Sequence, residues 1–149
     1  MDVLADTNIL VRRINRFDVQ HHEARDALAA LRRQGHRVCI VPQNIVECWS
    51  VATRPVSKNG LGLMPSHMER IAARIEGAFH LLPETVDVFV EWKKLVVAHA
   101  VSGVKVYDAR LVASALAFGI GTVLTFNTRD FRGYPGITTL HPADVVKQL

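Results

Sequence analysis

The chain has 149 residues, 49% of them hydrophobic and 21% charged, which is too apolar a composition for a disordered protein. Its apolar runs are too short to cross a bilayer, and the acid at position 2 is atypical of a secretion signal, so neither a membrane nor a secreted protein is expected. We therefore predict one cytoplasmic domain over residues 1–149, whose net charge of +4 is compatible with a polyanionic partner.

Short apolar runs alternate with segments of helical periodicity along the chain, separated by glycine and proline. Ser66 is the expected cap of one of the helices. In chain order we predict a strand at 3–5, a helix beginning at residues 9–11, a helix at 20–34, a strand at 38–41, a helix at 42–53, a loop or flexible arm at 54–65, a helix at 66–80, a brief strand at 81–82, a helix at 84–98, a buried helix at 106–118, strands at 122–125 and 137–140, and a helix from 142.

Uniformly apolar strands separated by helices are typical of a parallel sheet that is covered on both faces. The sequence thus predicts a three-layer α/β/α sandwich. Cys39 falls in a predicted strand and Cys48 in a predicted helix, without the spacing of a metal or redox motif, so both are expected to be buried thiols.

Acidic and amide side chains follow several of the predicted strands. Asp6 comes directly after the first strand, and Glu47 lies in the helix after the second. Asn127 and Asp130 follow the strand that ends at Thr125. Because ligands bind beyond the carboxyl ends of parallel strands, we expect these three segments to reach the same edge of the sheet. Asp108 opens the buried helix that leads into the fourth strand.

Each acid also has a purely structural interpretation. Asp6 and Asp108 are possible helix caps, the latter for a helix beginning at Ala109, and Glu47 is a possible member of a solvated helix face. Asp130 fits an ordinary turn.

Gathered at one edge, the carboxylates would repel one another unless a cation lay between them. Oxygen ligands favour Mg²⁺, which orients water and stabilises charge on a phosphoryl group. The seven histidines lack the spacing of a zinc site, and the sequence contains neither a phosphate-binding glycine loop nor a G-x-S-x-G motif.

Four landmarks together resemble the PIN-domain nucleases, and among them the VapC-type toxin ribonucleases of toxin–antitoxin pairs. They are VLADTN at 3–8, Glu47 in its helix, YDARLVA at 107–113 and LTFNTRDF at 124–131, in family order over almost the whole chain. Two positions depart from the family pattern: Asn127 stands where an acid is frequent, with Asp130 three residues later, and Tyr107 stands where histidine is frequent.

This resemblance implies a parallel sheet of about five strands, Mg²⁺ or Mn²⁺ at the acidic cluster, and hydrolysis of RNA phosphodiester bonds. It also implies a homodimer that is inhibited by a small antitoxin protein. Asp6 and Asp108 match the principal metal ligands, and Glu47 matches the third acid. Asn127 and Asp130 are expected to position water or a second ion. Thr7, Asn8 and Arg110 are weaker candidates for supporting or phosphate contacts.

Three other functions remain open from the sequence. A haloacid-dehalogenase-like phosphatase needs a second acid two residues after the first, where this chain has Asn8. A phosphoacceptor receiver domain needs paired acids and a late lysine, which are not in place. A catalytically silent PIN-like binding module is the third alternative, and the acids at 6, 47 and 108 argue against it.

Overall fold

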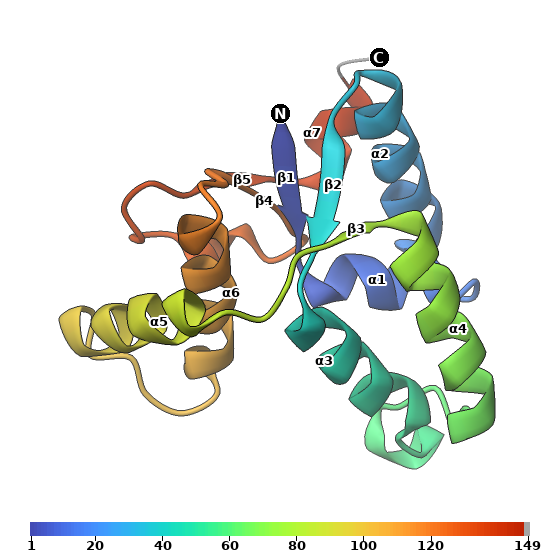
Figure 1. Ribbon diagram of the computed structural model, residues 1–149. Helices are drawn as coiled ribbons and strands as arrows, with labels where there is room; N and C mark the ends of the chain where they lie inside the picture. The colour runs from blue at the N-terminus through green and yellow to red at the C-terminus, as the bar shows by residue number, and fades with distance from the viewer. Residues whose placement is uncertain (148–149) are drawn as a thin grey trace.

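A computed structural model describes residues 1–147, and its centre is a parallel sheet of five strands (Figure 1). The strand order is β3-β2-β1-β4-β5, which puts the first strand in the middle of the sheet. The bounds are β1 (Asp2–Ala5), β2 (Arg37–Ile40), β3 (His80–Leu81), β4 (Thr122–Leu124) and β5 (Thr138–Leu140). The predicted parallel α/β architecture is confirmed.

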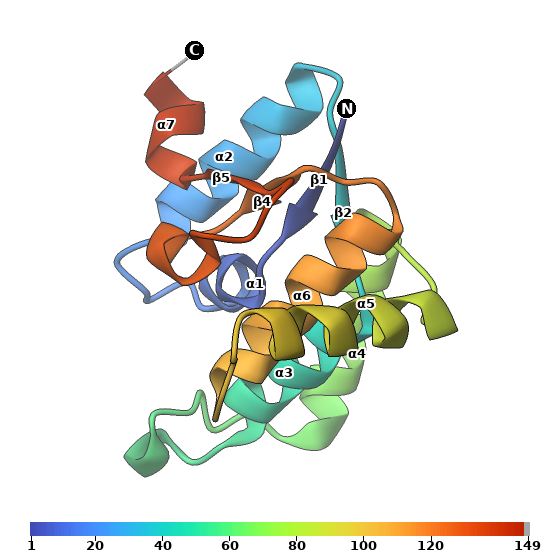
Figure 2. The same cartoon turned by 90° about the vertical axis from the view of Figure 1, so that its left-hand side faces the viewer.

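Helices cover both faces of this sheet. Figures 1 and 2 show α5 and α6 together on one side, while α1, α2 and α7 lie on the other. α3 and α4 pack against that second group. The bounds are α1 (Thr7–Ile14), α2 (His21–Arg33), α3 (Pro42–Thr53), α4 (Pro65–Ala78), α5 (Val86–Ala98), α6 (Lys105–Ala117) and α7 (Pro142–Lys147), with short 3₁₀ turns at Val56–Lys58 and Thr128–Phe131.

Successive residues of the central strand enter two different hydrophobic cores. Val3 and Ala5 pack with the helices of the α1 side, whereas Leu4 packs with α5 and α6. All three side chains are fully buried. This double burial explains why the strands appear in the sequence as continuous apolar runs instead of alternating ones.

Two helix starts differ from the prediction. α4 begins at Pro65 after the cap residue Met64, so Ser66 is not its cap; proline suits the first helical position because its missing N–H would be unpaired there. α6 begins at Lys105, which places Asp108 inside its first turn. The purely structural interpretation of Asp108, as the cap of a helix starting at Ala109, is therefore wrong.

The segment after α3 is a loop, one of the two predicted alternatives, and its backbone is bonded back to α3. The backbone N–H of Leu61 donates to the carbonyl of Val51, and that of Leu63 donates to Ala52. The chain approaches itself closely at Gly60, where an added Cβ would lie 2.0 Å from the carbonyl oxygen of Arg54.

We expect Gly60→Ala to lower the free energy of unfolding by about 1–3 kcal/mol, because the new methyl group must displace backbone. Gly77→Ala is the matched control, since a Cβ at that position of α4 meets nothing within 4 Å. Urea denaturation of the two variants measures the difference. Equal stability of Gly60→Ala and the unmodified protein would show that the loop does not close against Arg54.

Both cysteines are buried free thiols, as predicted. Within residues 1–147, none of the helices combines the length and the apolar content that a membrane crossing requires.

Candidate active site

Asp6 lies between the end of β1 and the start of α1. It occupies the cap position of α1, but its side chain makes no capping hydrogen bond. Instead, Oδ2 accepts hydrogen bonds from Thr125 Oγ1 at 2.7 Å and from Asn8 Nδ2 at 2.8 Å. The side chain is therefore held across the β1–β4 pair, and the interpretation of Asp6 as a helix cap is not supported.

Thr125 is fully buried directly after β4, and it supports Asp6 in a defined direction. Its hydroxyl oxygen accepts from Asn8 Nδ2 at 3.1 Å and from the backbone N–H of Asn127 at 2.9 Å. With its oxygen accepting twice, the hydroxyl hydrogen is left for Asp6. Thr125 was not among the residues predicted for this site, and its one signal in the sequence was a hydroxyl at the end of a buried strand.

Glu47 projects from α3 toward the start of α1. Thr7 Oγ1 donates to Glu47 Oε2 at 2.7 Å, and Gln43 Nε2 donates to Glu47 Oε1 at 2.7 Å. Both oxygens are thus bonded to protein donors, and Glu47 is partly buried. Glu47 does not belong to a solvated helix face.

Asp108 joins this group from the first turn of α6. Burial, together with the negative charges of Asp6, Asp130 and Glu47, raises the pKa of its carboxyl to about 6 against the opposing effect of Lys105. These electrostatic effects require short distances. Acids from four segments of the chain therefore gather at one edge of the sheet.

Asp6 is the most buried of these acids, with 7% of its surface exposed. Desolvation raises the pKa of Asp6 to about 6, although the hydrogen bond from Thr125 lowers it; the charge of Glu47 adds to the rise. A carboxylate that is both buried and close to other acids is costly to keep ionised. The site is consequently suited to a positively charged ligand.

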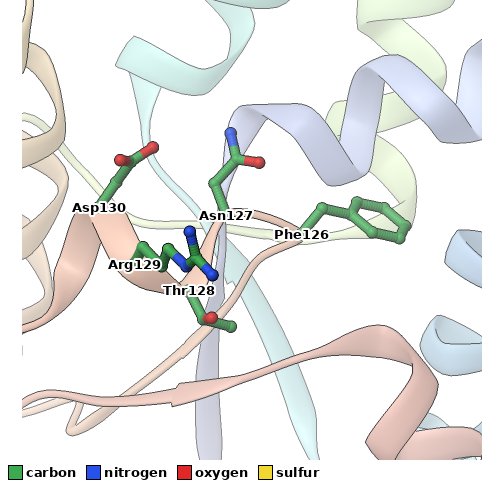
Figure 3. A pocket seen from close by; sticks show the side chains of 5 residues that line it. All are labelled: Phe126, Asn127, Thr128, Arg129 and Asp130. Atoms are coloured by element: carbon green, nitrogen blue, oxygen red, sulfur yellow. The ribbon is translucent and has the colours of Figure 1, made fainter.

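Asn127 and Asp130 form the outer part of the site. Asn127 directly precedes the 3₁₀ turn that follows β4, and Asp130 lies within that turn. They line a pocket of about 270 Å³ together with Phe126, Thr128 and Arg129. Figure 3 shows the side chains of Asn127 and Asp130 extending to the same side of the segment, while Phe126 points away from Asp130. Both Asn127 and Asp130 are exposed, so they are accessible to a large substrate.

The chemistry of the donors fits a hard cation. The acids gathered here offer carboxylate oxygens, which are ligands that Mg²⁺ prefers. No three His, Cys, Asp or Glu side chains within residues 1–147 are close enough to hold an ion together. That arrangement agrees with an ion that takes one or two carboxylates directly and keeps several water molecules.

A family model of the PIN domain matches residues 3–137, which include every acid of the site. The chain belongs to the PIN domain family. No curated protein matches its sequence significantly.

Several solved structures share the fold of this PIN domain. A toxin–antitoxin complex from Klebsiella pneumoniae is 22% identical with a TM-score of 0.64, covering 94% of this chain and 97% of that chain. DNA-bound VapBC from Salmonella typhimurium is 18% identical with a TM-score of 0.69, covering 95% and 98%. VapC20 from Mycobacterium tuberculosis, a toxin that cleaves the sarcin-ricin loop, is 18% identical with a TM-score of 0.61, covering 81% and 86%. At these identities the similarity concerns the fold.

A larger groove of about 700 Å³ lies away from the acids, between the end of α1, α2, the loop after α3, and α4. Its lining combines apolar and basic side chains. Among them are Phe17, Leu63 and Phe79, with Arg13, Arg32 and Arg74.

Proposed function

We propose that this PIN domain is a divalent-metal-dependent ribonuclease and the toxin of a toxin–antitoxin pair. The observation that carries the proposal is that Asp6, Glu47 and Asp130, from three other segments, all lie near enough to Asp108 to raise its pKa, with Asp130 lining an accessible pocket. Similarity in fold to VapBC structures, and to a toxin that cleaves the sarcin-ricin loop, supports RNA as the substrate class.

Asp6 and Asp108 are the proposed metal ligands, directly or through water. A divalent cation at this position would lower the pKa of a bound water and offset negative charge on the phosphoryl oxygens. Glu47 would orient the attacking water or contact the ion through a water molecule, since no three acids among the residues that the structure describes are close enough to hold an ion directly. Asn127 and Asp130, at the exposed mouth, would position water or the substrate backbone. The chain places no histidine in these roles, so the carboxylates would have to carry the proton transfer.

The proposal predicts RNA cleavage by the purified protein with Mg²⁺ or Mn²⁺ and none with excess EDTA, because paired acids without a cation repel a phosphodiester. The measurement is cleavage of end-labelled structured and single-stranded RNA, resolved on denaturing gels. Restoration of cleavage after Mn²⁺ is added back distinguishes metal loss from denaturation. Undiminished cleavage in EDTA would contradict the proposal.

An antitoxin is the proposed protein partner, because several structures of similar fold are complexes of a toxin with its antitoxin. The apolar and arginine-rich groove between α1, α2 and α4 is complementary to an acidic amphipathic segment of such a protein. Co-expression with the short protein encoded next to this chain tests the proposal by co-purification and by suppression of RNA cleavage. Arg13→Glu and Arg74→Glu are expected to weaken the complex with the antitoxin.

The homodimer expected from the family resemblance remains a prediction.

The alternative of a silent PIN-like binding module predicts RNA binding without cleavage at any metal concentration. The phosphatase alternative is disfavoured by Asn8, which donates its amide hydrogen to Asp6 and so occupies the position of the required second acid.

A further inference from the structure

Gln43 links the acid Glu47 to the opposite helical layer. It lies one turn before Glu47 on α3 and is 7% exposed. Its amide nitrogen donates to Glu47 Oε1 at 2.7 Å and to the backbone carbonyl of Tyr107, in α6, at 2.8 Å. Both amide hydrogens are therefore used, and one of them is committed to the acid.

Arg110 sets the direction of this amide. Arg110 Nη1 donates to Gln43 Oε1 at 3.0 Å. A guanidinium has only donors, so the amide oxygen must face Arg110 and the amide nitrogen must face Glu47. Arg110 is itself held by an ion pair from Nη2 to Glu84, in the segment before α5.

The neutral amide keeps the guanidinium away from Glu47. A direct arginine–carboxylate pair would offset the negative charge that a cation needs. The second oxygen of Glu47 is likewise bonded to a neutral donor, Thr7, whose hydroxyl accepts from Asn44 Nδ2 at 3.2 Å. Glu47 is thus oriented on both sides while it keeps its charge.

We propose that Gln43, oriented by Arg110, is a positioning residue that holds the Glu47 carboxylate for the metal-assisted step. This inference rests on the proposed role of Glu47 in the nuclease site. It also gives Arg110 a positioning role within the protein, in place of the phosphate contact considered from the sequence.

Kinetics of single and double variants test whether Arg110 acts on Glu47 through Gln43. Gln43→Met keeps the length of the side chain but removes the donors, and we expect kcat to fall about 10- to 100-fold with KM for RNA changed by less than about twofold. Gln34→Met, at an exposed position, is the matched control. Gln43→Asn, which keeps an amide but is too short to reach, should show the same loss.

Arg110→Met should lower kcat in the same direction and add nothing in the Gln43→Met background, because both changes release the same carboxylate. A rise in KM on Arg110→Met that persists in the double variant would overturn the proposal in favour of RNA binding by Arg110.

Two measurements without RNA separate this inference from the nuclease function. In the metal-free protein, the side-chain amide NMR signal of Gln43 should shift on Glu47→Gln and on Arg110→Met, while the signal of Gln34 stays unchanged. Calorimetry should show about tenfold weaker Mn²⁺ binding by Gln43→Met than by Gln34→Met. An unmoved Gln43 signal, or unaltered Mn²⁺ affinity, would overturn the inference even in a protein that cleaves RNA.

Discussion

Asp6→Asn and Asp108→Asn are each expected to lower kcat/KM for RNA cleavage by about 10²- to 10³-fold, equivalent to about 3–4 kcal/mol of transition-state stabilisation. Each change removes one negative charge from the proposed metal site and preserves the shape of the side chain. Because the two carboxylates would act as one unit, the double variant should lose little more than the stronger single variant.

The measurement is single-turnover cleavage at several Mn²⁺ concentrations. Asp26→Asn, at a surface acid of α2 paired with Arg25, is the control and should retain full activity. Metal-dependent cleavage that survives in both Asp6→Asn and Asp108→Asn would place the chemistry elsewhere in the molecule.

The same Asp6→Asn substitution is expected to stabilise the metal-free protein. Burial raises the pKa of Asp6 from 3.8 to about 6, so between these values the folded state binds more protons than the unfolded state. The free energy of unfolding therefore falls as the pH rises through this window, and the penalty is complete above about pH 6. At pH 7.5 the gain from Asp6→Asn should approach about 3 kcal/mol, and it should shrink toward zero near pH 4.

Urea denaturation in EDTA at pH 4, 6 and 7.5 measures this pH dependence. Asp26→Asn is again the control, and it should show a small change of opposite sign, because Arg25 holds the pKa of Asp26 below its usual range. Added Mg²⁺ should stabilise the unmodified protein at pH 7.5 but not Asp6→Asn. An Asp6→Asn variant that is less stable than the unmodified protein at pH 7.5 would show that the buried charge is already compensated within the protein.

The architecture and the position of the acids were predictable because both depend on local patterns. Apolar runs identified the strands, and their carboxyl ends identified Asp6 and Glu47 as neighbours. The helix predicted at 106–118 begins only one residue earlier, at Lys105, although Val104 carries no cap signal. The alternative interpretation of Asp108 as a helix cap was wrong, but the inclusion of Asp108 among the acids did not depend on it.

The supporting side chains were not predictable for a different reason. Gln43 and Tyr107 are hydrogen-bonded although they are 64 residues apart in the sequence, and Thr125 and Asp6 are 119 residues apart. A single amide or hydroxyl gives no periodic signal, so its importance follows only from the three-dimensional arrangement. The i, i+4 spacing of Gln43 and Glu47 on one helix was the one local sign of their pairing.

The central place of the first strand has a consequence during synthesis of the chain. β1 emerges first, but its neighbour β4 and the hydroxyl that holds Asp6 are translated more than a hundred residues later. A nascent or truncated chain that ends before Thr125 contains Asp6 and Glu47. It lacks the hydroxyl of Thr125, which donates a hydrogen bond to Asp6. The hydrogen bonds that orient Asp6 can therefore form only after nearly the whole chain has been synthesised.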